Sequence, residues 1–276
     1  MTAIRFPQGK TKAVTLSYDD AVEADITLVS ILKKYGLKCT FNINSGLLLE
    51  ETRADRDPFR RMSVEQAKEL YIGSGHELAV HTLTHCFPEQ LTPVQLTHEV
   101  MKDRENIEKY FGNIAVGMAY PCGIYNDSIV DILKSCGICY ARTTECDESF
   151  NLPQDWLRLK GTARHINPRL MELCDRFLNT TIATYTPAKL FYLWGHSYEF
   201  VSDNNWEVIE QFGKKMGGHD DIWYATNVEI YDYCEAYKKL RFNAEGDACM
   251  NLSSMDLYFQ NKDKIYCVKS GETLHL

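Results

Sequence analysis

The sequence predicts an α/β protein in which about seven parallel strands form a closed or nearly closed barrel. Short apolar runs alternate with amphipathic helical stretches through most of the chain, which is the pattern of successive βα units. The chain has 276 residues, enough for one large domain with a substantial core. Beyond residue 240 the pattern changes to short alternating runs, which favours a small C-terminal β appendage.

Seven apolar runs are bounded clearly enough to be strands. We expect them near residues 13–18, 37–43, 76–80, 115–120, 138–142, 190–195 and 221–225. In barrels of this type, the side chains that carry chemistry collect where strands end and the following loops begin. Residues at these strand ends are therefore the first candidates for a functional site.

The helices between these strands have recognisable boundaries. Ser63 is followed three residues later by Gln66, which predicts a capping box at the start of a helix. Helices expected over 22–35 and 126–136 are each followed by a glycine, a common helix stop. The polar stretch 44–62 is expected to be a long loop on the functional face, where it would shape a substrate groove.

The chain is divided at residue 240 in this interpretation. Residues 1–240 form the barrel, and residues 241–276 form a β-hairpin appendage packed on it. The alternating runs 255–259 and 264–268 flank a polar turn and indicate the hairpin. A unit this small is not expected to fold alone.

Composition excludes several classes of partner. The net charge is −8 and there is no basic run, which argues against nucleic acid and anionic membranes. No stretch approaches the roughly 18 apolar residues of a membrane span. The segment 1–10 lacks an apolar signal core, so we expect a cytoplasmic protein. The ten cysteines are scattered through expected strands and helices, and we expect reduced thiols.

Two strand ends offer metal ligands. Asp19 and Asp20 follow the strand at 13–18, and His81 and His85 follow the strand at 76–80. One carboxylate and two imidazoles make a three-ligand site for a divalent metal, with positions open for water and substrate. Zinc is the preferred ion, although cobalt, iron or nickel suit the same donors. The other carboxylate would be free to act as a base.

Four segments that follow strands resemble the successive motifs of the polysaccharide deacetylases, the NodB-homology or carbohydrate esterase family 4 enzymes. These segments are Tyr18-Asp19-Asp20, His81-Thr82-Leu83-Thr84-His85, Ala119-Tyr120-Pro121-Cys122-Gly123 and Leu193-Trp194-Gly195-His196. The resemblance covers roughly residues 10–240. It implies a distorted (β/α) barrel that carries a divalent metal and removes acetyl groups from amino sugars or polysaccharides.

The resemblance also implies roles for individual residues. Asp20, His81 and His85 would hold the metal, Asp19 would be the base that activates metal-bound water, and His196 would protonate the leaving amine. The oxyanion would be held by the metal and a backbone N–H near the third motif. The residues expected to contact substrate are Tyr120, Pro121, Cys122 and Trp194.

The third motif departs from the family pattern. Ala119 stands where many members have an arginine that steadies the catalytic aspartate, and Cys122 stands where they have an aromatic residue. Arg142 lies at the end of the next strand, where the family usually places the acidic partner of that arginine. We expect Arg142 to reach Asp19, to supply the missing cation and so to belong to the catalytic set.

Two residues near these motifs each allow two interpretations. Glu199 either orients His196 through a hydrogen bond or caps the following helix. His165 either lines the sugar site or is an ordinary loop histidine, and the second interpretation is favoured.

The sequence thus predicts a hydrolase of non-peptide carbon–nitrogen bonds, a metal-dependent deacetylase acting on the N-acetyl group of an amino sugar or oligosaccharide. One alternative is an O-acetyl esterase or another C–N hydrolase on the same fold. Another is a carbohydrate-binding pseudoenzyme. The expected partner is the acetylated sugar, and nothing in the sequence predicts the oligomeric state or the chain length of the substrate.

Overall fold

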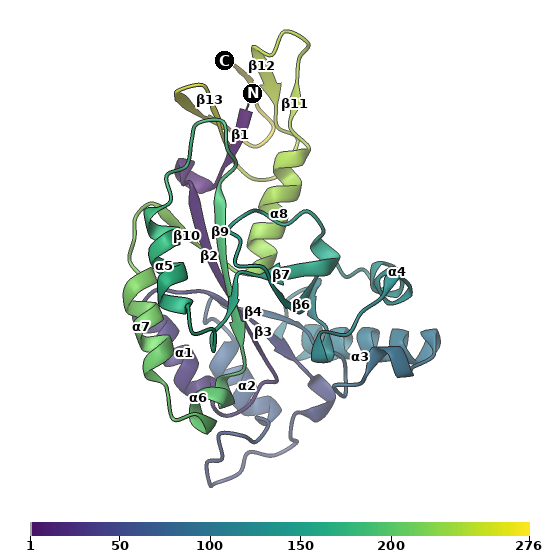
Figure 1. The fold of residues 1–276 in the computed structure, drawn as a ribbon. Coiled ribbons are helices and arrows are strands. Elements are labelled where there is room, and N and C mark those ends of the chain that lie inside the picture. Colours follow the sequence, from purple (N-terminus) through teal and green to yellow (C-terminus); the bar gives the residue numbers. More distant parts are fainter. Residues whose placement is uncertain (1) are drawn as a thin grey trace.

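A computed structural model describes residues 2–276 and shows a central, curled parallel sheet surrounded by helices (Figure 1). The strands follow the order β7-β6-β5-β4-β3-β2-β9-β8, and β10 also pairs with β2. The first and last strands of this path are separated by Thr162 alone, which brings the two ends of the sheet near each other. The strands are β2 (Lys12–Asp19), β3 (Cys39–Ile43), β4 (Glu77–Val80), β5 (Gly117–Ala119), β6 (Tyr140–Cys146), β7 (Leu159–Gly161), β8 (Ala163–Arg164), β9 (Lys189–Gly195) and β10 (Ile222–Tyr224).

The predicted α/β barrel is therefore confirmed. All seven expected strands are present in the parallel sheet, and the short strands β7 and β8 were not predicted. The helices that connect and cover the strands are α1 (Asp25–Lys34), α2 (Val64–Tyr71), α3 (Pro93–Phe111), α4 (Asp127–Ser135), α5 (Leu170–Asn179), α6 (Ser197–Ser202), α7 (Glu207–Met216) and α8 (Asn227–Lys238).

Strand β2 pairs with three other strands of the sheet and carries the first motif at its carboxyl end. It pairs with β3, β9 and β10, and all eight of its residues are buried. A strand buried on both faces favours a continuous apolar run over an alternating one, as residues 13–16 illustrate. Its carboxyl end delivers Asp19 into the interior of the barrel end.

The predicted local signals are also found. The Ser63 hydroxyl accepts a hydrogen bond from the Gln66 backbone N–H at 3.0 Å, and the Gln66 side chain accepts one from the Ser63 N–H at 2.9 Å. This capping box begins α2. Gly36 and Gly137 follow α1 and α4 with φ values of 66° and 73°, which glycine adopts without steric cost.

Beyond α8 the chain forms two small antiparallel sheets. One contains β1 (Thr2–Arg5), β13 (Leu257–Asn261) and β14 (Lys264–Val268), and the other contains β11 (Arg241–Phe242), β12 (Ala248–Met250) and β15 (Thr273–His275). The expected hairpin is present as β13 and β14, but the N-terminal strand β1 completes its sheet. Strand β1 and the C-terminal residues lie at the same end of the molecule (Figure 1). The division of the chain at residue 240 stays a prediction.

None of the helices within residues 2–276 combines the length and the apolar character that crossing a bilayer requires.

Candidate metal and catalytic site

A cavity of about 290 Å³ lies at the carboxyl ends of the barrel strands. All of the predicted site residues except Arg142 and Pro121 line it. The complete lining is Asp19, Asp20, Arg61, His81, His85, Tyr120, Cys122, Thr144, Trp194, His196 and Tyr198. The motifs identified in the sequence thus meet in one place, although the first and last lie more than 170 residues apart.

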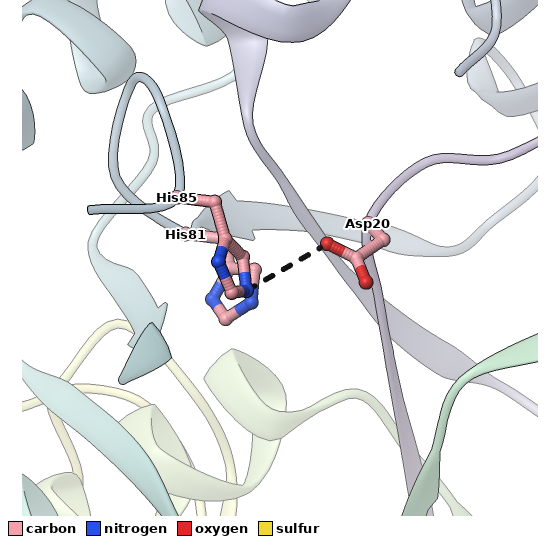
Figure 2. Close-up of side chains that lie close together, drawn as sticks. All are labelled: Asp20, His81 and His85. Carbon is pink, nitrogen blue, oxygen red and sulfur yellow. Dashed lines mark ion pairs between the residues drawn. The ribbon is translucent and has the colours of Figure 1, made fainter. Parts of the chain in front are cut away.

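Three of these side chains form a cluster suited to a metal ion. Asp20, His81 and His85 each offer one donor atom, and the three atoms lie within 4.8 Å of one another. Figure 2 shows the carboxylate of Asp20 facing the two imidazole rings, with Oδ1 of Asp20 3.9 Å from Nε2 of His85. One carboxylate and two imidazoles are a donor set that zinc and similar divalent ions bind.

The orientation of His81 also fits a ligand. Its Nδ1 lies 2.8 Å from the carbonyl oxygen of Ala119, so Nδ1 is assigned the proton and Nε2 keeps its lone pair. Nε2 is buried and has no hydrogen-bond partner in the part of the chain that the structure describes. Burial lowers the pKa of His81, which favours the neutral form that a metal requires. A buried acceptor nitrogen with no other partner among the described residues is suited to bind a metal ion.

Asp20 has a charged neighbour that the sequence did not predict. Oδ1 of Asp20 lies 2.7 Å from Nη1 of Arg61, although without an aligned hydrogen bond among residues 2–276. The same Arg61 nitrogen donates to the backbone oxygen of Asp20. Arg61 comes from the polar stretch after β3, which a β-bridge between Val22 and Arg61 holds beside the first motif. No sequence spacing links Arg61 to Asp20, so only the fold brings them together.

The backbone around the cluster is strained and firmly held. Asp20, Thr82 and His85 have positive φ values of 89°, 62° and 55°, which non-glycine residues rarely adopt. Asn44 donates to the carbonyl oxygens of His81 and Thr82, at 2.5 and 3.0 Å. Asp103 of α3 accepts from the His81 N–H at 2.9 Å. These contacts fix the turn that presents both histidines.

Asp19 lies between the donor cluster and His196. Its Oδ2 is 4.0 Å from Nε2 of His81 and 3.7 Å from Nε2 of His196, while Asn42 donates to Oδ1 at 2.8 Å. Burial alone would raise the pKa of Asp19, but the charges of Arg142 and the two histidines outweigh it and lower the pKa to about 2. Asp19 is therefore ionised at neutral pH.

Arg142 lies where the sequence predicted it. Its Nη2 donates to Oδ2 of Asp19, and its Nη1 donates to the backbone oxygen of Thr143 at 3.0 Å. The guanidinium is buried and lies 4.4 Å from the ring centre of Trp194. The expected contact between Arg142 and Asp19 is thus present, while its role in catalysis stays a prediction.

Glu199 lies close enough to His196 for either interpretation, although Nδ1 of His196 makes no aligned hydrogen bond among the described residues. Its Oε1 lies 3.3 Å from Nδ1 of His196, and its Oε2 accepts from the His196 backbone N–H at 3.4 Å, at the start of α6. Burial lowers the pKa of His196, but the carboxylates of Glu199 and Asp19 outweigh burial and the pKa is raised. His165 lies behind Glu199, buried and outside the cavity lining, which favours the second interpretation over a sugar contact.

The four expected substrate contacts differ in exposure. Cys122 is exposed, with φ 55°, whereas Tyr120, Pro121 and Trp194 are buried. The Tyr120 hydroxyl donates to the Leu157 oxygen at 2.8 Å, and Trp194 is 3% exposed. Cys122 is therefore accessible to a substrate, whereas Tyr120 and Trp194 are accessible only through the atoms that line the cavity. Thr144 and Tyr198, which lies two residues after His196, complete the wall beside Arg61.

Comparison with known proteins agrees with the motifs. The family model described as polysaccharide deacetylase matches residues 7–141, just under half of the chain. No curated protein sequence matches significantly. The "putative polysaccharide deacetylase from Mycobacterium smegmatis" has a TM-score of 0.58 at 17% identity, covering 86% of this chain and 94% of that one. A family 4 pseudoenzyme from Bacillus anthracis has a TM-score of 0.51 at 16% identity, covering 83% and 68%.

A third solved structure matches over a shorter part of the chain. The Streptococcus pyogenes deacetylase PplD, in complex with acetate, is 27% identical over 47% of this chain, with a TM-score of 0.42. The chain spans 55% of the length of that protein. The longer structural matches share the barrel fold. The region matched by the family model contains the first three motifs, the last of which ends at Gly123. Residues 7–141 match the polysaccharide deacetylase family model, and the chain shares its fold with solved structures described as a putative polysaccharide deacetylase and a family 4 pseudoenzyme.

Proposed function

We propose that the protein is a metal-dependent deacetylase that hydrolyses the N-acetyl group of an amino sugar or oligosaccharide. The family supports hydrolysis of acetyl groups as the general activity. One observation carries the more specific proposal: an ionised Asp19, held by Arg142, lies between a three-donor cluster and a histidine that a carboxylate contacts. With these roles, a base, an acid and a metal-ligand set would surround one small cavity.

The residues Asp20, His81 and His85 would hold the divalent ion, preferably zinc. When bound, such an ion polarises the acetyl carbonyl and lowers the pKa of water. Nε2 of His81 and Oδ1 of Asp20 are among the buried atoms without aligned hydrogen bonds in the described residues, and they face one another in the three-donor cluster, which supports them as ligand atoms.

Asp19 would act as the base. Its Oδ2 faces the donor cluster, and its carboxylate is ionised, so it can accept a proton from the attacking water. A carboxylate with a low pKa is a weak base, and the reaction therefore depends on water that is already acidified. Arg142 and Asn42 each hold one oxygen of Asp19, which fixes the direction from which the proton is taken.

His196 would act as the acid. An amine is too basic to leave unprotonated near neutral pH, so the reaction needs a donor on the leaving-group side. The raised pKa of His196 keeps the imidazolium populated, and its Nε2 faces the cavity while Nδ1 faces Glu199. A backbone N–H near Cys122 would stabilise the oxyanion of the tetrahedral intermediate.

The size of the cavity indicates how much of the substrate it encloses. About 290 Å³ is at the small end of ligand sites, which fits one acetylated sugar unit better than several. Further units of an oligosaccharide would lie outside, beside the exposed Cys122.

Two assays separate this proposal from its alternatives. Metal-loaded protein should release acetate from N-acetylglucosamine oligomers faster than from acetylated xylan, whereas an O-acetyl esterase would show the reverse order. A pseudoenzyme would release acetate from neither substrate, and purified protein without a stoichiometric divalent ion would favour it.

A further inference from the structure

A row of polar side chains lies on the Nδ1 side of His196, whereas the Nε2 side of the ring faces Asp19. The Tyr18 hydroxyl is 3.2 Å from Nδ1 of His165, Nε2 of His165 is 3.1 Å from Oε2 of Glu199, and Oε1 of Glu199 is 3.3 Å from Nδ1 of His196. The four residues come from β2, the segment after β8, α6 and the end of β9. Only the folded barrel brings them into one line.

The position of His165 is tightly determined. Its side chain is 2% exposed, and its ring stacks on Phe200 at 4.1 Å and on Tyr18 at 5.7 Å between ring centres. A Cβ at Gly195 would lie 2.0 Å from Nδ1 of His165. The glycine immediately before His196 therefore provides the space that the His165 ring occupies.

The protonation state of His165 follows from its surroundings. Burial lowers the pKa of His165, so the ring is neutral and has one donor and one acceptor nitrogen. The Tyr18 hydroxyl lies 3.2 Å from Nδ1 and can donate its hydrogen to that nitrogen. Nε2 then carries the hydrogen and faces Glu199. Within residues 2–276, neither this nitrogen nor Nδ1 of His196 makes an aligned hydrogen bond, and each lies 3.1 to 3.3 Å from an oxygen of Glu199.

Glu199 has charged neighbours, and the neutral ring of His165 differs from them in its effect on the Glu199 carboxylate. Arg164 contacts Oε1 through Nη2, and His165 lies at Oε2, so the two oxygens have different partners. Asp19 is the other carboxylate in contact with His196, and Asp20 contributes at longer range. An uncharged donor at Oε2 fixes the carboxylate without cancelling the negative charge that His196 requires.

We propose that His165 is a positioning residue for His196 that acts through Glu199. The neutral imidazole holds Glu199 so that Oε1 stays directed at Nδ1 of His196, and His196 keeps Nε2 directed at the leaving group. This inference rests on the proposed role of His196 as the acid.

Two substitutions test the inference. His165→Phe keeps a ring against Phe200 and Tyr18 but removes the donor, whereas His165→Gln keeps an N–H donor. We expect kcat to fall roughly 10- to 100-fold in His165→Phe, with KM and bound metal unchanged, because the acid loses its orientation. We expect His165→Gln to retain more of the wild-type kcat. A wild-type kcat for His165→Phe, or equal losses in both variants, would overturn the inference.

A double-mutant cycle tests the route through Glu199. In a Glu199→Gln background, His165→Phe should cause little further loss of kcat, because the carboxylate that it positions is already gone. Losses that multiply independently would contradict the route.

A spectroscopic measurement separates this inference from the proposed function. The Nδ1 proton of His196, observed by NMR at neutral pH, should shift in His165→Phe relative to wild type. If the wild-type protein released no acetate from any substrate, the proposed function would fail, while the NMR comparison would still decide the inference. An unchanged His196 resonance in His165→Phe would overturn it.

Discussion

Arg142 on β6 contacts Asp19 on β2 across the inside of the barrel end, although three strands separate them in the order of the sheet. Arg142 is paired in register with Ala119 of β5, and residues paired in this way point to the same face. The small side chain of Ala119 leaves room for the guanidinium. We therefore propose that Arg142 supplies, from the neighbouring strand, the cation that the resemblance leads one to expect at position 119.

Replacing Arg142 should destabilise the protein and alter its pH dependence. In Arg142→Gln the buried Asp19 loses its counter-charge, which we expect to reduce the free energy of unfolding at neutral pH by about 3–5 kcal/mol. The depressed pKa of Asp19 stabilises the fold above its unfolded value of about 3.9, and this is lost as pH falls through about 2. Urea unfolding between pH 2 and 7 should therefore show a flatter pH dependence in the variant.

A second-site change provides the matched control for this prediction. Ala119→Arg in an Arg142→Ala background should recover part of the lost activity, because positions 119 and 142 are neighbours in register. If Arg142→Gln showed wild-type activity and stability, Asp19 would not depend on this cation.

Replacing His196 should remove turnover without removing metal. We expect His196→Gln to lower kcat by about 10²- to 10⁴-fold, the usual contribution of a general acid, with the metal content unchanged. The raised pKa of His196 means that its protonated form persists to higher pH than a free imidazole, and activity is lost as pH rises through that pKa. In Glu199→Gln the alkaline limb of the kcat profile should move to lower pH. Metal loss in His196→Gln would show that the roles are wrongly assigned.

Metal removal should abolish activity reversibly. We expect chelation to remove acetate release and added zinc to restore it, and we expect the affinity for zinc to fall at least 10-fold in His81→Ala and His85→Ala. Isothermal titration of the metal-free protein measures this directly. His98 lies on α3 outside the cavity lining, and His98→Ala is the matched control that should bind zinc normally. Equal affinities in all variants would exclude this ligand set.

The capping box of α2 should contribute to stability independently of the site. Ser63→Ala removes the acceptor for the Gln66 N–H, which we expect to cost about 1 kcal/mol of unfolding free energy. Ser63→Asn keeps a capping acceptor and should lose less. Chemical denaturation of the two variants checks this, and equal stabilities would contradict a capping role.

The sequence predicted the parts of the fold that local patterns encode. The buried strand β2 and its neighbours appear as apolar runs, and the Ser63 box appears as a spacing of three residues. Strands β7 and β8 have three and two residues and include Lys160 and Arg164, so no apolar run marks them, whereas the short strands β5 and β10 lie within apolar runs. Strand β1 pairs with β13 across almost the whole chain, a contact that no local window contains.

The residues of the candidate site likewise include some that the sequence could predict and some that it could not. Asp19, Asp20, His81 and His85 lie at or shortly after the carboxyl ends of β2 and β4, so their meeting at one barrel end could be predicted. Arg61 comes from a polar loop and reaches Asp20 only through the bridge to Val22. The sequence supplied two interpretations of Glu199, and the structure places its two oxygens near Nδ1 and the backbone N–H of His196.

The most direct test of the account measures acetate and free amine released from N-acetylglucosamine oligomers by zinc-loaded wild-type and Asp19→Asn protein. The account predicts equal amounts of acetate and new amine from the wild type. It predicts at least a 100-fold lower rate from Asp19→Asn at an unchanged zinc content, as expected for loss of a general base. No release by the fully zinc-loaded wild type, or equal rates for the two proteins, would contradict it.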